Sequence, residues 1–260
     1  MCRAIDRVRS EFTKQAPDFN AYIAGQSKAL FNRSAAAQLH LTGTERILEV
    51  AAGTCAFGRT LAPLAGWITE LDATPAMLDA GRAENEKAGI RNADYVTAAA
   101  ESLPFADGSF DAAVCRLAFH HFTSPEPVFS EMRRVVRPGG QLVIADMLAR
   151  DEPLRAAADR YETLRDPSHV RCLSADEFLA LAERFGMETA HRSVTDIPVK
   201  LDDWMALTRV PSALRAEIAA AMRADMEGSE KTGFSPFQDG GGIAFVQHWG
   251  LFIFRNPSAD

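Results

Sequence analysis

The sequence contains few cysteines, and their positions exclude two kinds of stabilised domain. Only four occur, Cys2, Cys55, Cys115 and Cys172, and no two of them lie close together along the chain. Zinc sites need paired ligand spacings, and disulfide scaffolds need a much higher density of cysteine. We therefore predict no metal site and interpret the four residues as reduced thiols of a cytoplasmic protein.

A basic excess and a long apolar run are also lacking. The 28 lysines and arginines are outnumbered by 35 aspartates and glutamates, which leaves a formal charge of −7. Binding to a phosphate backbone requires a positive surface, so nucleic acid is not an expected partner. The opening segment is charged throughout, and no run reaches the roughly 18 apolar residues that cross a bilayer. We expect no membrane span.

The sequence does contain an alternation of strand-like and helix-like segments. Segments with a helical period separate the short apolar runs, an order that predicts an α/β fold with a mainly parallel sheet and helices on both faces. At 260 residues with 47% hydrophobic content, one elaborated domain is expected. The strands are expected at 46–50, 67–71, 93–99, 110–116 and 141–147.

Capping residues predict where several helices begin and end. Thr74 is a suitable N-cap, Pro75 suits the first turn, and Gly89 follows the last turn. Ser174 and Glu177 have the spacing of a capping box. Helices are also expected within residues 1–40, 151–185 and 202–228, followed by a last strand within 240–255.

The turn after the first strand is poor in glycine for a ligand-binding loop. The stretch "RILEVAAGTCAFGRTL", residues 46–61, has only Gly53 and Gly58. In open parallel sheets, ligands bind beyond the carboxyl ends of the strands, where a helix N-terminus and free backbone N–H groups face them. Asp72 ends the second strand, 23 residues after Glu49, where an acid can accept hydrogen bonds from both ribose hydroxyls. This spacing predicts an adenosine-bearing cofactor.

Five successive segments carry family-like motifs: "ILEVAAGTCAFG", "ITELDATPAMLDAGR", "AAAESLPFADGSFDAAVCRLAFHHF", "EMRRVVRPGGQLVIAD" and "RDPSHVRCLSADEFLALAERFGM". In this order, between about Phe12 and Phe185, they resemble the class I S-adenosylmethionine-dependent methyltransferases, in particular the ubiquinone/menaquinone-biosynthesis-like branch (methyltransferase type 11). The resemblance implies a Rossmann-like, doubly wound, mainly parallel seven-stranded sheet with helical lid elements, and S-adenosyl-L-methionine as cofactor.

The same resemblance implies how a single methyltransferase domain spanning residues 1–260 is divided. Residues 1–40 would form a helical lid and residues 41–150 the cofactor-binding core. Residues 151–260 would form a C-terminal half with the last strand and a helical cap at about 200–235. The apolar residues of that segment have helical spacing, and a dimer surface is the alternative to a cap. The expected acceptor is a small molecule methylated on oxygen or carbon, and the chain is expected to be a monomer or a homodimer.

Residues that match the family motifs form the expected cofactor site. Glu49 and the backbone at Ala51 and Gly53 would hold the methionine portion, and Asp72 would bind the ribose. Met77 would lie against the adenine, with packing in the core as the alternative. Carbonyl groups near Arg116 would face the methionine amino group. The full expected set is Glu49, Ala51, Gly53, Asp72, Ala73, Met77, Ala100, Glu101, Arg116 and His121.

The first motif departs from the family pattern at two glycine positions. A methyl group at Ala51 is tolerable if the backbone there is extended. Cys55 would cost roughly 1 kcal/mol or more if its site needs a left-handed conformation. In addition, Ala99 replaces an aspartate that would accept a hydrogen bond from the adenine amino group, so one polar contact is expected to be lost.

Two adjacent histidines are the candidates for catalysis. A sulfonium methyl group is already electrophilic, so the protein mainly has to align the nucleophile, which can contribute roughly 7–11 kcal/mol. An oxygen or acidic carbon benefits from a base of near-neutral pKa. His120 and His121 follow the fourth strand, and at most one of them is expected to be this base. The alternative is a structural histidine that stacks on the cofactor or bonds a loop carbonyl.

Other residues are expected to cover the site. Aromatic residues of the N-terminal segment would line the lid, with plain helix packing as the alternative: Phe12, Phe19, Tyr22 and Phe31. The segment "RDPSHVR" would contact the acceptor, with a capped surface loop as the alternative. The expected acceptor-binding residues are Tyr22, Asp166, His169 and Arg171.

Two other functions are consistent with parts of this pattern. The missing glycines suit a noncatalytic or regulatory S-adenosylmethionine-binding protein of the same fold. An acid after the second strand also suits a nicotinamide-dependent oxidoreductase, although the first turn lacks the glycine pattern of that class.

Overall fold

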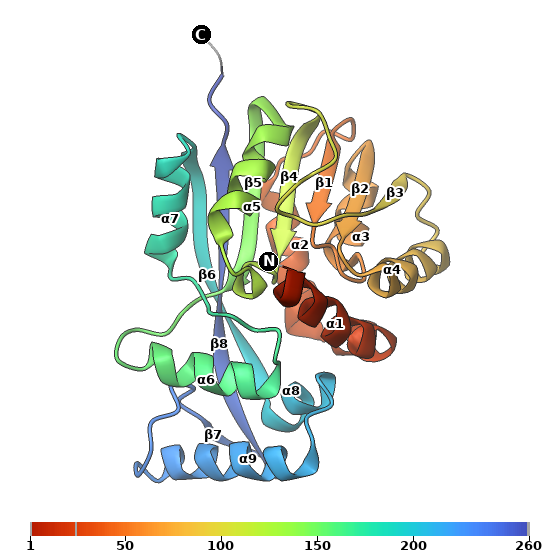
Figure 1. Cartoon of the computed structure of the whole chain (residues 1–260). Helices are drawn as coiled ribbons and strands as arrows, with labels where there is room; N and C mark the ends of the chain where they lie inside the picture. The colour runs from red at the N-terminus through yellow and green to blue at the C-terminus, as the bar shows by residue number, and fades with distance from the viewer. Residues whose placement is uncertain (1, 24, 259–260) are drawn as a thin grey trace.

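A single mixed sheet forms the centre of the molecule (Figure 1). The computed structural model describes residues 2–23 and 25–258, apart from the side chains of residues 2–4, 18, 21–23 and 26. Within these residues, eight strands form one sheet in the order β3-β2-β1-β4-β5-β8-β6, and β7 pairs with β8. The strands are β1 (Arg46–Val50), β2 (Trp67–Asp72), β3 (Ala93–Thr97), β4 (Phe110–Arg116), β5 (Val136–Met147), β6 (Glu188–Lys200), β7 (Phe237–Asp239) and β8 (Gly242–Arg255).

Helices cover both faces of this sheet and the carboxyl ends of its parallel strands (Figure 1). Helices α2 and α3 pack on one face, and α5 and α7 pack on the other. The helices are α1 (Cys2–Ile23), α2 (Gln26–Gln38), α3 (Ala56–Leu61), α4 (Pro75–Lys87), α5 (Pro125–Val135), α6 (Arg155–Arg165), α7 (Ala175–Arg184), α8 (Leu201–Leu207) and α9 (Ser212–Met226), with short 3₁₀ turns η1 (Ala62–Leu64) and η2 (Phe119–His121).

The parallel strands are short and apolar because they are buried on both sides. In β1, Ile47 packs into the core beneath α2 and α3, while Leu48 packs into the core beneath α5. Strands β1, β2, β3, β4 and β5 run parallel, β8 pairs antiparallel with β5, and β6 pairs antiparallel with β8. The predicted α/β fold, with a mainly parallel sheet and helices on both faces, is confirmed.

The strand prediction missed the long edge strand β6. Its side chains are mostly exposed and polar, so the stretch has no continuous apolar run. The family resemblance implied seven strands, and the sheet has an eighth, the short strand β7, which pairs with β8. The capping box of α7 is confirmed, because Ser174 Oγ accepts from the Glu177 N–H at 3.1 Å and Glu177 Oε2 accepts from the Ser174 N–H at 2.7 Å. Thr74 is the N-cap of α4, but its side chain makes no capping hydrogen bond.

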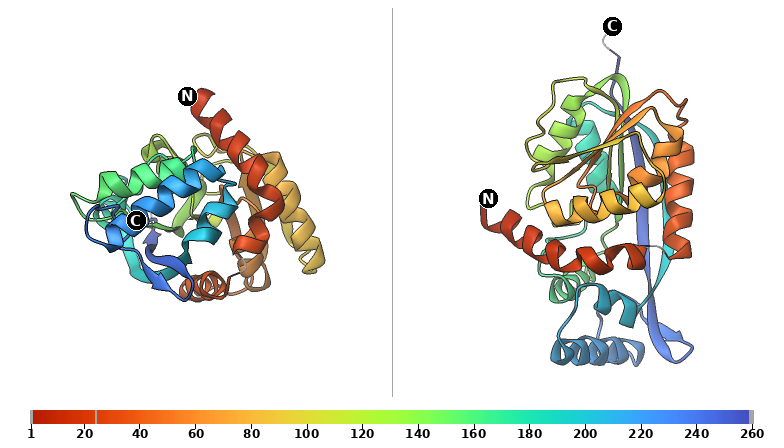
Figure 2. Two further views of the ribbon diagram at one scale, coloured as in Figure 1. Left: turned by 90° about the horizontal axis from the view of Figure 1, so that it is seen from below. Right: turned by 90° about the vertical axis from the view of Figure 1, so that its right-hand side faces the viewer.

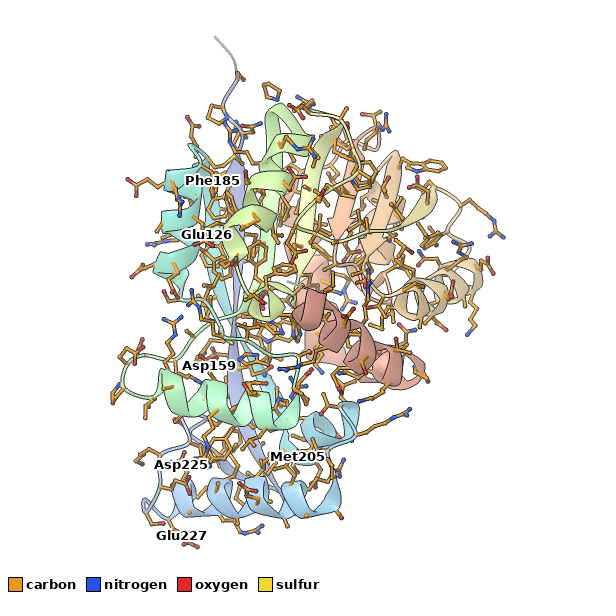
Figure 3. All side chains as sticks on the ribbon, in the orientation of Figure 1. Glu126, Asp159, Phe185, Met205, Asp225 and Glu227 are labelled. Carbon is orange, nitrogen blue, oxygen red and sulfur yellow. The ribbon has the colours of Figure 1, made fainter. Side chains whose placement is uncertain are left out.

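A second layer lies beyond the carboxyl ends of β1, β2, β4 and β5. Helices α6, α8 and α9 lie below these ends in Figure 1, and Figure 3 shows Asp159 on α6 and Met205 on α8 within this layer. Helix α1 crosses the same edge beside α4 (Figure 2). No helix in the described part of the chain is long and apolar enough to cross a bilayer. The carboxyl edge of the sheet is therefore enclosed by helices from both ends of the chain.

Candidate active site

The turn between β1 and α3 is built from three left-handed residues. Ala51, Gly53 and Cys55 have φ values of 55°, 54° and 58°. The Ala52 N–H donates to the Leu71 carbonyl at 2.9 Å, which ties the turn to β2. The condition under which Ala51 would be unstrained, an extended backbone, is therefore not met. Both non-glycine residues bear the left-handed conformation, at a cost of about 1 kcal/mol each.

The Cys55 side chain packs against α4. It is fully buried beside Leu78, and a Cβ placed on Gly81 would lie 2.4 Å from its Sγ atom. Glycine at position 81 thus provides the space that the thiol occupies. The substitution of glycine by cysteine adds a side chain to the interior of the fold, between the turn and α4.

Asp72 is held at the end of β2 by two backbone donors. Its Oδ2 accepts from the Gly53 N–H at 2.8 Å, and its Oδ1 accepts from the Thr74 N–H at 2.7 Å. Burial raises the pKa of this carboxyl group above its ordinary value. Met77 packs on the same turn, since a Cβ placed on Gly53 would lie 3.2 Å from the Met77 Cε. The structure thus brings Gly53, Asp72 and Met77 together, as the motifs predict.

Glu49 lies beside a second buried acid that the sequence analysis did not identify. It is paired in register with Glu70 of β2, and both carboxyl groups are buried. Glu49 Oε2 accepts from the Gly58 N–H at 2.7 Å. Burial raises the pKa of both acids, and the neighbouring Glu49 charge raises that of Glu70 further, well above its usual range. The raised pKa favours the neutral, protonated form of Glu70.

The remaining members of the expected cofactor set lie along the same edge. The Ala73 carbonyl accepts from Nε of Arg9, which joins α1 to the end of β2 at 2.9 Å. Ala100 is buried after β3, and Glu101 beside it is partly exposed. Arg116 ends β4 with its guanidinium group buried, 5.5 Å from the centre of the Trp249 ring.

His120 forms a buried pair with Asp146 at the ends of β4 and β5. Its Nδ1 lies 2.5 Å from Asp146 Oδ1, and the Met147 N–H also donates to that oxygen at 2.7 Å. A carboxylate only accepts, so Nδ1 carries the hydrogen and Nε2 keeps its lone pair. Burial alone would lower the pKa of His120, but the charge and hydrogen bond of Asp146 raise it overall. Within the described residues, Nε2 has no hydrogen-bond partner.

His121 has the opposite electrostatic environment. Its ring lies edge-on to Phe12 of α1 at 5.0 Å, and its Nδ1 donates to the Ser168 carbonyl at 3.1 Å. Burial and the neighbouring charge of His120 lower the pKa of His121 to about 3. His121 is therefore neutral at physiological pH and too weakly basic to be an efficient proton acceptor.

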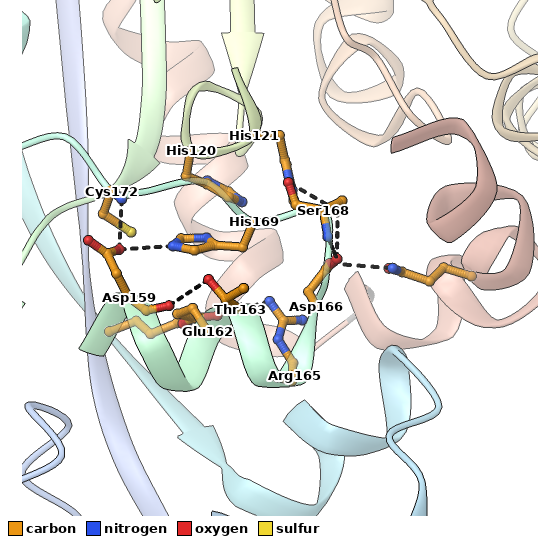
Figure 4. Close-up of polar contacts among 12 residues, drawn as sticks. His120, His121, Asp159, Glu162, Thr163, Arg165, Asp166, Ser168, His169 and Cys172 are labelled. Carbon is orange, nitrogen blue, oxygen red and sulfur yellow. Dashed lines mark hydrogen bonds and ion pairs between the residues drawn. The ribbon is translucent and has the colours of Figure 1, made fainter. Parts of the chain in front are cut away.

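Asp166 and His169 belong to the same buried cluster (Figure 4). Asp166 Oδ1 accepts from the Ser168 N–H at 2.9 Å, and Gln15 of α1 donates to Asp166 Oδ2 at 3.4 Å. Burial would raise the pKa of Asp166, but neighbouring positive groups and the Ser168 hydrogen bonds lower it to about 2. The His169 ring lies 5.6 Å from that of His120. Since both side chains are buried, a surface loop does not describe this segment.

Arg171 and one of the expected lid residues, Phe31, are placed elsewhere. The Arg171 side chain is 43% exposed and donates to Glu177 Oε1 at 2.7 Å, outside the cluster. The Tyr22 side chain lies outside the described residues. Phe19 packs on Phe12 at 6.2 Å, in the helix that covers His121, whereas Phe31 packs on Trp249 in the core.

Asp159, His169 and Cys172 bring three possible metal-ligand atoms within 4.8 Å of one another. Asp159 Oδ1 accepts from His169 Nε2 at 2.8 Å and from the Cys172 N–H at 3.0 Å. Burial, followed by nearby carboxylates, raises the pKa of the Cys172 thiol well above its ordinary value. The hydrogen bonds of Asp159 to His169 and Cys172 join the three residues into one cluster.

The acids that orient these histidines were missed in the sequence. Asp146 follows the apolar run of β5 just as Asp72 follows that of β2, so its position at a strand end was a usable signal. Asp159 offers no such signal, because it is one of several polar residues on α6 and only the packing of His169 identifies it.

Comparison with known proteins agrees with this arrangement. A family profile described as "Methyltransferase domain" matches residues 48–144. The chain is 30% identical over 177 residues to the uncharacterized methyltransferase YcgJ of Bacillus subtilis, covering 66% of this chain and 69% of that protein. It is 33% identical over 145 residues to the ubiquinone/menaquinone biosynthesis C-methyltransferase UbiE of Coxiella burnetii, covering 54% of this chain and 58% of that one. The solved structure of BH2331 from Bacillus halodurans, assigned as a methyltransferase, superposes with a TM-score of 0.81 at 27% identity and covers 87% of this chain and 99% of its own.

Proposed function

Because the chain belongs to the class I S-adenosylmethionine-dependent methyltransferases, we propose that it methylates an oxygen or an acidic carbon of a small molecule, with His120 as the general base. The His120–Asp146 pair is the observation that carries the proposal. It combines a fixed tautomer, a raised pKa and an unoccupied ring nitrogen at the ends of β4 and β5.

The cofactor residues in this proposal lie along the ends of β1, β2, β3 and β4. S-adenosylmethionine supplies an electrophilic methyl group when it is bound. Asp72 would accept hydrogen bonds from the ribose, because its carboxylate is fixed in place by the N–H groups of Gly53 and Thr74. The close approach of Gly53 to Met77 fits a binding surface that has no room for a further side chain.

The proposed base acts through a proton held at one defined atom. Asp146 keeps hydrogen on Nδ1 of His120, so Nε2 receives the acceptor's proton as the new bond to the methyl group forms. The Asp146 carboxylate then stabilises the imidazolium ion that results. His121 would pack against the bound molecules as a neutral ring beneath Phe12.

Helix α1 would serve as the lid in this proposal, and α8 and α9 as the cap. In α1, Arg9 contacts the end of β2, Phe12 contacts His121, and Gln15 contacts Asp166. These three contacts span the carboxyl edge, so closing α1 would exclude water from the transfer step. The roles of residues 1–40 as a lid and of about 200–235 as a cap within a single domain are thus part of this proposal.

The acceptor class is argued from chemistry and from the relatives. A histidine base suits phenolic oxygens and carbons made acidic by a neighbouring carbonyl group. The similarity to UbiE, a C-methyltransferase of quinone biosynthesis, favours the carbon acceptor, although the matched region covers only 58% of UbiE. The absence of a nucleic-acid partner, the cytoplasmic location and the monomeric or dimeric state stay predictions.

The test is cofactor binding followed by an acceptor screen. Titration calorimetry with S-adenosylmethionine should show binding, and a screen of phenols and quinols should release S-adenosylhomocysteine with at least one of them. His120→Gln should abolish that release while binding is retained. Binding without turnover on any acceptor would instead favour a noncatalytic role.

A further inference from the structure

Arg116 has a buried charged edge without a partner. Its side chain is 8% exposed, and among the described residues neither Nε nor Nη2 makes a hydrogen bond. Burial lowers the pKa of Arg116 to about 10, so the group stays charged at neutral pH. A buried donor without an acceptor costs about 1–3 kcal/mol, and more when the group is charged. The missing partner is therefore an acceptor, and an anion is the best one.

Another arginine of the same chain shows what such an edge binds. Arg134 donates from Nε to Glu131 Oε1 at 2.7 Å and from Nη2 to Glu131 Oε2 at 2.8 Å. These two nitrogens form one side of the guanidinium group and match the two oxygens of a carboxylate. Arg116 leaves the corresponding pair of nitrogens empty, at a place where water is largely excluded.

The acids near Arg116 are already engaged. Asp146 binds His120, and Glu49 accepts from the Gly58 N–H. Trp249 Nε1 donates to Gln247, which donates to Glu162 at 3.3 Å.

The remaining oxygen of Glu162 is also occupied. Glu162 Oε2 accepts from Arg165 at 3.0 Å, so this carboxylate has partners on both of its oxygens. The protein's own acids are thus distributed around Arg116 without filling its open edge.

A second buried basic group interacts electrostatically with Arg116. Lys28 of α2 is 9% exposed, and its pKa is lowered to about 7, first by burial and then by the charge of Arg116. Asp203 opposes this effect, and Arg165 adds to it. Cations placed close enough to disfavour one another produce a positive potential, which an incoming anion relieves.

We propose that the Nε–Nη2 edge of Arg116 is a carboxylate-binding subsite of the methyl-transfer site. The proposal rests on the function proposed above. Arg116 is paired in register with Ala145, the neighbour of Asp146, and Asp146 binds His120, so a ligand bound at this edge lies near the proposed base. The carboxylate can come from an acidic acceptor or from the methionine portion of the cofactor.

The cofactor source is tested with two thioethers. S-adenosylhomocysteine carries the amino-acid group, and 5′-methylthioadenosine lacks it. If Arg116 binds the cofactor carboxylate, Arg116→Gln should weaken S-adenosylhomocysteine binding at least about tenfold and leave methylthioadenosine binding within about twofold. Arg116→Lys, which keeps the charge but not the paired nitrogens, should recover part of the loss.

The acceptor source is tested with a matched acid and amide. The protein saturated with methylthioadenosine is titrated with 4-hydroxybenzoate and with 4-hydroxybenzamide. If the acceptor supplies the carboxylate, the wild type should prefer the acid, and Arg116→Gln should abolish that preference. Arg137→Gln is the control, because Arg137 pairs with Asp111 near the start of β4 and is 53% exposed.

The thioether titrations and the acid and amide titrations are the two arms of the test, and together they decide the proposal. A loss of carboxylate preference in either arm supports the subsite and identifies its source. Preferences that are the same in Arg116→Gln and the wild type in both arms overturn it, provided that circular dichroism shows a folded variant. If the wild type binds neither thioether, the proposed function fails, and the acid and amide titration, repeated without thioether, still tests Arg116 independently.

Discussion

The ends of β1 and β2 and the ends of β4 and β5 lie side by side on the sheet, yet they satisfy their buried polar groups by different means. At the first pair, the backbone N–H groups of Gly53, Thr74 and Gly58 fix the acids Asp72 and Glu49. At the second pair, ionisable side chains bind one another, as in the His120–Asp146 pair.

This difference separates a preformed surface from one that depends on protons. Backbone donors cannot change their charge, so the N–H groups that hold Asp72 and Glu49 in the first region, the proposed cofactor half, are the same at every physiological pH. The acceptor half contains two adjacent histidines whose pKa values move in opposite directions. We expect substitutions in the first half to change cofactor affinity, and substitutions in the second half to change rate and pH dependence.

The largest expected effect is that of Asp146→Asn. The amide cannot stabilise the imidazolium ion of His120, so the methylation rate should fall by about 10²–10⁴-fold. Cofactor affinity should change little, because no backbone donor of the first half is touched. Stopped-time assays of S-adenosylhomocysteine release, on an acceptor found by the screen, give the rate, and calorimetry gives the affinity.

The pH profile and a matched pair of residues sharpen this test. The acid limb of the rate should lie above the ordinary histidine pKa in the wild type and move down in Asp146→Asn, since the carboxylate raises the pKa of His120. Asp196→Asn is the control, because Asp196 binds His248 at 2.6 Å in the same manner but is 71% exposed. Equal losses in the two variants would argue against a catalytic pair.

The next largest effect is that of Asp72→Ala on cofactor binding. Loss of the carboxylate leaves the ribose hydroxyls unpaired and should weaken binding by about 1–3 kcal/mol. Calorimetry with S-adenosylhomocysteine measures this change. Asp94→Ala on β3 is the control, because Asp94 accepts a hydrogen bond from Trp67 at an exposed position. An unchanged dissociation constant would remove Asp72 from the cofactor site.

A third effect is the acid dependence of stability caused by His121. The unfolded chain takes up this proton near pH 6.5, whereas the folded pKa of His121 is about 3. The folded state is therefore destabilised as pH falls below 6.5, by up to about 1.4 kcal/mol per pH unit. Urea unfolding of His121→Gln between pH 6.5 and 5 should show a flatter dependence than the wild type.

His120 should act on the other side of neutrality. Its folded pKa is raised, so its contribution to stability is complete below pH 6.5 and is lost as pH rises through the folded pKa. His120→Gln should flatten only this upper part of the curve. If His120→Gln and His121→Gln flatten the same part of the curve of stability against pH, the prediction that the pKa values of the two rings shift in opposite directions is wrong.

The two halves also differ in how far the sequence predicted them. The class I methyltransferase family, the cofactor and the sheet are confirmed, because motif order and apolar runs are local signals that packing does not alter. Asp72 was found from its place after a strand. The pairing of Glu49 with Glu70 depends on the register between two strands, which spacing along the chain does not give.

For the region at the ends of β4 and β5, the proposed acceptor half, the sequence predicted only a set of candidate residues. The pair His120 and His121 could be named from the sequence, but choosing between them required Asp146 and Phe12, which come from distant segments. Arg171 was grouped with Asp166 because they are neighbours in sequence, and the ion pair with Glu177 draws it away. Charged side chains are long, and which of several partners they meet is decided by tertiary packing.

The smallest expected effect concerns strain in the first half. Ala51 has a φ of 55°, which glycine adopts more readily, so Ala51→Gly should raise the free energy of unfolding by about 0.5–1 kcal/mol. Ala180→Gly at an exposed position of α7 should lower it by about 1 kcal/mol. Cofactor affinity should stay the same, because the turn already has the left-handed conformation that glycine would permit. A gain in affinity as well as stability would show that the alanine distorts the turn, and the cofactor half would then be less preformed than its hydrogen bonds indicate.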